Sequence, residues 1–173
     1  MFEDFHPANQ AKIITSSVPG PKSIALREKQ EELESNNRSY PRSIPIAFSE
    51  GKGAIIEDVD GNTYIDFLAG CGVFNLGHNN PYILDAINNR GDSLTQTVDF
   101  PTEVKISFME RLNQVLPETL RNKVKINFGG PTGSDAVESA IKLARIITGL
   151  HSIIAFQGGY HGMTMGALSV TSK

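Results

Sequence analysis

The spacing of apolar and polar residues predicts several helices in the first two thirds of the chain. Residues 24–36 are rich in helix formers, and apolar positions recur at helical spacing over 101–116. Asn80 and Pro81 read as a helix cap followed by proline at the first helical position. Residues 39–45 contain two prolines, each of which disfavours helix at the residue before it, so this stretch is predicted to be extended.

Residues 53–67, GAIIEDVDGNTYIDF, predict a β-hairpin. Two β-rich runs flank Asp60 and Gly61, which suit a two-residue turn because both accept positive φ. The predicted register pairs Asp58 with Thr63 and Ile56 with Ile65. The two isoleucines would then share a buried face.

The last third alternates between strand-like and helix-like patterns. Residues 123–128 and 152–156 predict strands, and residues 134–148 predict a helix that ends at Gly149. Residues 167–170 suit a third strand or a turn. This order predicts an α/β fold with the beginning of a doubly wound, mainly parallel sheet.

Composition narrows the class of protein. The chain has 173 residues, 39% hydrophobic and 20% charged, with a formal net charge of −3, so it lacks the basic surface typical of nucleic-acid binding. No apolar run reaches the length of a membrane span, and the polar N-terminus does not resemble a secretion signal. Cys71 is the only cysteine, which favours a reducing, cytoplasmic location.

The stretch FGGPTGS (residues 128–134) is a candidate phosphate site. A strand is predicted to end there and a helix to begin, so free backbone amides and the helix dipole favour an anion. Gly133 allows close approach, and the Ser134 hydroxyl is a donor. The spacing matches neither a P-loop nor a dinucleotide fingerprint. A tight turn capped by Ser134, with Glu138 and Lys142 as a surface pair, explains the same residues.

A second glycine-rich turn, QGGYHGMTMGA (residues 157–167), follows the next predicted strand. Ligands of open α/β sheets bind at this edge, and Tyr160 offers a face for a planar cofactor with His161 beside it. A structural role for this pair is the alternative. The histidines and the cysteine show no metal-ligand spacing.

The segments GHNNP, GGPTGSDAVESAIKLAR and FQGGYHGMTMGALSVT, in this order, together resemble the class III aminotransferases, which use pyridoxal 5′-phosphate (PLP). ESNNRSYPRSIPIAF and DVDGNTYIDFLAGCGVFNLGHNNP resemble most closely the diaminobutyrate–2-oxoglutarate aminotransferases within that family. The resemblance implies transfer of the terminal amino group of L-2,4-diaminobutyrate to 2-oxoglutarate, giving aspartate 4-semialdehyde and glutamate.

The resemblance also implies roles for individual residues. Gly133 and Ser134 match positions that hold the cofactor phosphate. Tyr160 matches the aromatic residue that stacks on the pyridine ring, and His161 the histidine beside it. Asn80 stands where the family usually has a histidine, and as a helix cap it serves equally well.

Substrate-binding residues are implied in the first half of the chain. Cys71, Val73 and Phe74 match a segment near the substrate, and relatives acting on other ω-amino acids can carry tyrosine in place of this cysteine. Tyr40 and Arg42 fall where an N-terminal strand of the family approaches the substrate. Arg42 suits a carboxylate, and a surface position beside two prolines is its alternative.

The implied fold is the N-terminal part of a fold-type I PLP-dependent transferase. Residues 1–67 are expected to contribute to the small domain, and residues 68–173 to begin the PLP-binding domain. The family forms homodimers with shared active sites. Its Schiff-base lysine and its aspartate that pairs with the pyridinium nitrogen are expected downstream, so no catalytic residue is assigned and this chain alone is expected to be inactive.

Other functions fit the same residues. Within the family, the alternative is an aminotransferase for ornithine, 4-aminobutyrate or another ω-amino acid. Outside catalysis, the alternatives are a fragment that binds PLP or phosphate without turnover, and a truncation product that does not fold fully.

Overall fold

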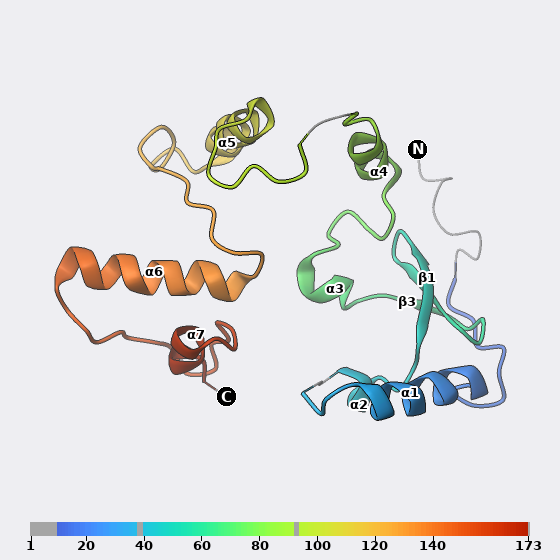
Figure 1. The fold of residues 1–173 in the computed structure, drawn as a ribbon. Coiled ribbons are helices and arrows are strands. Elements are labelled where there is room, and N and C mark those ends of the chain that lie inside the picture. Colours follow the sequence, from blue (N-terminus) through green and yellow to red (C-terminus); the bar gives the residue numbers. More distant parts are fainter. Residues whose placement is uncertain (1–9, 38–39, 92–93, 173) are drawn as a thin grey trace. The chain divides into compact units, whose positions relative to one another are not determined.

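The computed structural model describes residues 10–37, 40–91 and 94–172 (Figure 1). The chain divides into two compact units, Met1–Thr95 and Gln96–Lys173, and each is described here by itself. The observed division follows Thr95. The domain boundary implied after residue 67 stays a prediction.

The first unit is a small antiparallel sheet with helices before and after it. Its elements are α1 (Pro21–Leu33), α2 (Tyr40–Ser43), β1 (Phe48–Lys52), β2 (Ile55–Asp58), β3 (Thr63–Ile65), α3 (Ala69–Gly72) and α4 (Pro81–Asn88). The strand order is β1-β2-β3. The hydrophobic pattern predicted β2 and β3 but missed β1, whose sequence FSEGK lacks a β-rich run.

The hairpin forms where predicted, but its register differs by one residue. Ile55 pairs with Ile65 and Ile56 with Tyr64. The predicted register was wrong because the loop is longer than two residues. Asp58 and Asn62 close it with a backbone bond of 3.0 Å, and Gly61 lies inside it at φ 89°. A one-residue slip turns a strand's side chains to the other face, and Ile65 is 51% exposed.

The prediction that residues 39–45 are extended was also wrong at Tyr40–Ser43, which form the short helix α2. The Ile44 amide donates to the Tyr40 carbonyl at 2.9 Å, which closes one helical turn. Proline in the first turn loses no bond because that amide has no partner within the helix. Ser39 lies outside the described residues.

The loop between β2 and β3 anchors the segments that precede the sheet. The Asp60 carboxylate accepts from the amides of Lys22 and Ser23, both at 2.8 Å, and so caps α1 from a distant part of the chain. A Cβ on Gly20 would collide with this carboxylate. The Asn62 side chain accepts from the amides of Ile14 and Thr15.

Asp58 is the buried centre of this loop, with 1% of its surface exposed. Its carboxylate accepts from two backbone amides, from Asn62 Nδ2 and from the Tyr64 hydroxyl. Burial raises the pKa of Asp58, but the hydrogen bonds from Asn62 and Tyr64 outweigh it, so the pKa lies below its usual value. Burial and the bond to Asp58 raise the pKa of Tyr64 to about 12.

The second unit contains α5 (Glu103–Val115), α6 (Gly133–Thr148) and α7 (Met165–Val170). The predictions for α5 and α6 are confirmed to within two residues at each end. Gly149 ends α6 in the left-handed conformation, at φ 69°, as its position predicted.

Residues 123–128 and 152–156 form no ladder in the described part of the chain, and residues 167–170 are helical. The strand predictions were therefore wrong here. A strand exists only against a hydrogen-bonded neighbour, and these two segments do not bond to each other. The fold is mixed α/β, and its described sheet is the antiparallel one of the first unit.

Few side chains are fully buried. Among the described residues, the buried apolar side chains are Ala167 and Val170 alone, whereas Ser23, Asp58, Asn62 and Thr63 are buried and polar. Hydrogen-bond networks therefore hold the loops in place. In the part of the chain that is described, no helix combines the length and apolar character that crossing a membrane requires.

Candidate functional site

The predicted candidate phosphate site lies at the N-terminus of α6. Thr132 caps the helix: its hydroxyl accepts from the Asp135 amide, and the Asp135 carboxylate accepts from the Thr132 amide. The cap is thus Thr132, and the alternative in which Ser134 caps the helix is wrong. Ser134 instead lies in the first turn, one residue after Gly133.

The first turn of α6 suits an anion. The amides of Gly133 and Ser134 stand at helix positions that have no carbonyl partner within the helix, and the helix dipole adds partial positive charge. A Cβ built on Gly133 meets no atom within 4 Å, so the space beside this backbone is open. These donors and this space fit a phosphate group, such as that of PLP.

The loop with Tyr160 and His161 lies against this helix start. A Cβ on Gly162 would collide with Ser134 Oγ, so only glycine allows the two segments to approach this closely. The structure therefore brings together the four predicted cofactor-binding residues in one unit. Tyr160 is 71% exposed, so its ring is accessible to a planar partner.

Residues 171 and 172 hold this loop in place. The His161 amide donates to Thr171 Oγ1 at 3.0 Å, and the Gly158 amide donates to Ser172 Oγ at 2.6 Å. The Ser172 amide donates back to the Gly159 carbonyl at 2.9 Å. The backbone on both sides of Tyr160 is thus fixed, although its side chain is exposed.

Glu138 ties α6 to α7. Its carboxylate accepts from Thr164 Oγ1 and from the Gly166 amide, both at 2.7 Å. The hydrogen bond from Thr164 is the main cause that lowers the pKa of Glu138. Glu138 therefore caps α7 in addition to its electrostatic interaction with Lys142. The predicted surface pair of Glu138 and Lys142 did not include this capping role.

The predicted substrate loop has an unusual backbone. Ala69, Gly70, Cys71 and Gly72 all have positive φ, from 48° to 87°, and so form one left-handed turn. For a residue other than glycine this conformation costs roughly 1–2 kcal/mol. Such strain persists only where the surroundings enforce it, and it concentrates at functional sites.

The structure joins two of the predicted substrate residues. Tyr40 Oη and Cys71 Sγ lie 2.7 Å apart, at hydrogen-bond distance. Arg42 instead donates to the Asn36 carbonyl at 2.9 Å, and Val73 is 75% exposed. Phe74 packs on His78, with ring centroids 4.6 Å apart.

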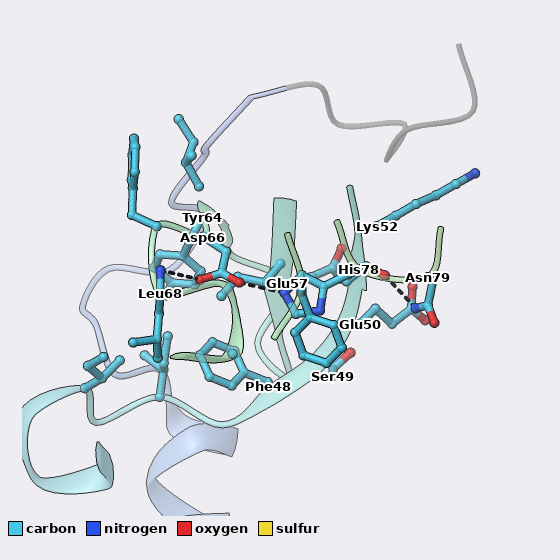
Figure 2. A pocket seen from close by; sticks show the side chains of 18 residues that line it. Phe48, Ser49, Glu50, Lys52, Glu57, Tyr64, Asp66, Leu68, His78 and Asn79 are labelled. Atoms are coloured by element: carbon cyan, nitrogen blue, oxygen red, sulfur yellow. Dashed lines mark hydrogen bonds and ion pairs between the residues drawn. The ribbon is translucent and has the colours of Figure 1, made fainter. Parts of the chain in front are cut away.

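Beside this loop lies an open, largely apolar hollow of about 910 Å³ (Figure 2). Its lining includes Phe48, Tyr64, Asp66, Phe74 and His78. His78 Nε2 lies 2.6 Å from Asp66 Oδ2. Burial raises the pKa of Asp66, but the bonds from His78 and from the amides of Ala69 and Leu68 outweigh it and lower the pKa.

Sequence reasoning missed several residues that shape these segments. The capping-box spacing of Thr132 and Asp135 is a readable local signal. Glu138, Asp66 and His78 act over longer distances, which no local pattern specifies. Among the described residues, no cluster of histidine, cysteine and acidic side chains could hold a metal ion.

The chain belongs to the class III aminotransferases. The family model for "Aminotransferase class-III" matches residues 36–173. A curated relative, the diaminobutyrate–2-oxoglutarate aminotransferase of Haemophilus influenzae, is 47% identical over 148 residues, which are 84% of this chain and 32% of that protein. The chain thus spans about a third of the length of this relative.

Solved structures agree in fold. An omega-transaminase from Sphaerobacter thermophilus has a TM-score of 0.70 and 31% identity, covering 84% of this chain and 33% of that one. A transaminase described as having PLP bound has a TM-score of 0.66 and 29% identity, covering 82% and 33%. The expected family and fold are therefore confirmed.

Proposed function

We propose that the protein carrying this sequence transfers the terminal amino group of L-2,4-diaminobutyrate to 2-oxoglutarate, giving aspartate 4-semialdehyde and glutamate. The observation that supports this most strongly is the 47% identity to the Haemophilus influenzae enzyme over 84% of the chain. The solved relatives named omega-transaminases are less similar.

The proposed cofactor of the enzyme is PLP. The amides of Gly133 and Ser134 and the Ser134 hydroxyl would hold its phosphate, and the exposed Tyr160 ring would cover its ring with His161 alongside. PLP supplies the electron sink for amino-group transfer when it is bound. The role of these residues is to bind and orient it.

In the first unit, the proposed donor-binding residues are those of the left-handed turn with Cys71 and its contact with Tyr40. A thiol at position 71 leaves more room than the tyrosine that other relatives carry there. Phe74 and Val73 complete the apolar side, and Arg42 can meet a carboxylate once it releases the Asn36 carbonyl.

We also propose that the intact protein is a cytoplasmic homodimer with shared active sites. By the family resemblance, the lysine that bonds the cofactor and the aspartate that pairs with its ring nitrogen stand outside these 173 residues. The 173 residues alone are therefore expected to hold the phosphate without completing amino transfer.

A substrate panel tests the proposal. Intact protein loaded with PLP is given 2-oxoglutarate with diaminobutyrate, ornithine or 4-aminobutyrate, and glutamate is measured. The highest kcat/KM is expected with diaminobutyrate. A higher kcat/KM with ornithine or 4-aminobutyrate would show that this compound, and not diaminobutyrate, is the preferred amino donor. No glutamate from any donor would contradict the aminotransferase activity.

A further inference from the structure

The loop that carries Cys71 leaves the sheet at Asp66 and returns to it at His78. Its two ends are joined, because His78 Nε2 lies 2.6 Å from Asp66 Oδ2. Both side chains are shielded, with 8% of Asp66 and 22% of His78 exposed. Figure 2 shows Asp66 between the Leu68 amide and the His78 ring.

We propose that Asp66 and His78 are positioning residues, which together hold the left-handed turn at 69–72 and so set the place of Cys71 in the substrate site. This inference rests on the proposed function, because only the family resemblance makes Cys71 a substrate residue. The close contact between His78 Nε2 and Asp66 Oδ2, called the clasp below, is itself a feature of the structure.

Asp66 holds the beginning of the turn. Its Oδ1 accepts from the amides of Leu68 and Ala69 at 2.8 and 2.9 Å, while its Oδ2 faces His78. These two amides directly precede and begin the left-handed turn. The Asp66 carboxylate thus fixes the direction in which the chain enters the turn. It also hydrogen-bonds to His78, the residue at which the loop ends.

His78 holds the end of the loop through its backbone and its ring. Its amide and carbonyl both pair with Gly53 at 2.9 Å, which joins the loop to the sheet. A Cβ on Gly51 would lie 3.0 Å from His78 Cγ, so the ring occupies the space beside that strand. The ring therefore has little freedom to leave Asp66.

Phe74 links His78 to the turn. Its ring centroid lies 4.6 Å from that of His78, and a Cβ on Gly70 would lie 2.6 Å from Phe74 Cδ2. His78 thus supports Phe74, and Phe74 covers the backbone of the turn at Gly70. The neighbouring Cys71 then meets Tyr40 Oη at 2.7 Å.

Ala69 and Cys71 need such support because each has positive φ without being glycine. A strained turn relaxes when the groups that enforce it are removed. Loss of the clasp is therefore expected to loosen residues 68–74 and move Cys71 away from its place, while the rest of the unit stays folded.

Amide hydrogen exchange of the intact protein measures this loosening. His78→Leu removes the ring nitrogen but keeps an apolar side chain beside Phe74. His78→Gln keeps a nitrogen donor at similar reach. Exchange across residues 68–74 is expected to rise about tenfold in His78→Leu and to stay within about twofold of the wild type in His78→Gln.

Asp85→Ala is the matched control for Asp66→Ala. Asp85 also accepts an amide hydrogen bond, from Asn89 Nδ2 at 2.7 Å, but it lies on α4 outside the loop. Asp66→Ala is expected to speed exchange across 68–74, and Asp85→Ala is not. If Asp66→Ala does not fold, the comparison of the two His78 variants decides the matter.

The kinetic readout separates positioning from general stability. In the intact enzyme, His78→Leu is expected to raise KM for the amino donor about tenfold with kcat changed less than about threefold, and His78→Gln to restore KM. Equal exchange rates in His78→Leu and His78→Gln, or equal KM values, would overturn the proposal. The hydrogen-exchange measurement needs no substrate. It therefore tests whether Asp66 and His78 hold the turn even if the proposed function is wrong.

Discussion

At the scale of single residues, Thr132 and Ser134 have different tasks although they lie two positions apart. The Thr132 hydroxyl accepts from the Asp135 amide of α6, whereas Ser134 lies in the first turn with its Oγ beside Gly162. Stability and the proposed phosphate binding at this helix start are therefore expected to be separable.

Thr132→Ala is expected to lower the free energy of unfolding by about 1 kcal/mol, because the helix loses its cap. Ser134→Ala is expected to change that free energy little but to weaken PLP retention about tenfold, because a hydrogen bond to a charged group is lost. Urea unfolding and equilibrium dialysis of PLP measure the two effects. Equal free energies of unfolding together with equally weak PLP retention in the two variants would contradict these separate roles of Thr132 and Ser134.

The buried carboxylate of Asp58 predicts a loss of stability in acid. Its pKa in the folded protein lies below the unfolded value of 3.8. Its contribution is therefore fully present above pH 3.8 and is lost as the pH falls from there through the folded pKa. Urea midpoints measured between pH 6 and pH 2.5 are expected to fall in this acid range.

Asp58→Asn is the variant that isolates this contribution. The new amide would face Asn62 Nδ2 donor to donor, so stability at pH 7 is expected to fall by about 1–3 kcal/mol. The acid decline should also become shallower. An unchanged acid decline in this variant would mean that other groups cause it.

At the scale of elements, local signals in the sequence predicted α4, α5 and α6 well. Asn80 caps α4 with its side chain, and Gly149 ends α6 in the left-handed region. Each signal acts within one turn of its helix, so the surrounding fold does not change it. Asp60 and Gly61 likewise located the hairpin, although the predicted two-residue turn gave the wrong register.

Features that depend on distant partners were not predictable. The hairpin register follows from a loop closed by Asp58 and Asn62, and α1 is capped by Asp60 from the sheet. Residues 123–128 have a strand-like composition but pair with no strand in the described residues. Composition alone does not say which segment pairs with which.

Gly149→Ala tests the end of α6. At φ 69°, alanine is expected to cost roughly 1–2 kcal/mol of unfolding free energy. Gly133→Ala is the comparison within the same helix, because a Cβ there meets no atom within 4 Å and the φ is helical. Equal losses in urea unfolding would contradict the role given to Gly149.

At the scale of the whole molecule, the described part of the chain exposes many large apolar side chains. On α6 these include Leu143, Ile146 and Ile147, at 58%, 79% and 73% exposed. Water contact with such a face is unfavourable, at about 25 cal/mol per Å². The 173-residue chain alone is therefore expected to bind the dye ANS.

Substituting Ile146 and Ile147 together by Lys is expected to reduce the ANS signal of the 173-residue chain without loss of α-helical circular dichroism. An unchanged signal would mean that dye binds elsewhere. A chain that binds no dye at all would contradict the exposure of this face.

The proposed reaction of a class III aminotransferase containing this chain moves the terminal nitrogen of diaminobutyrate to 2-oxoglutarate. Intact PLP-loaded protein is given diaminobutyrate labelled with ¹⁵N at its terminal amine, together with 2-oxoglutarate, and glutamate is analysed by mass spectrometry. ¹⁵N-labelled glutamate is the expected product. Unlabelled glutamate, or none, would contradict it.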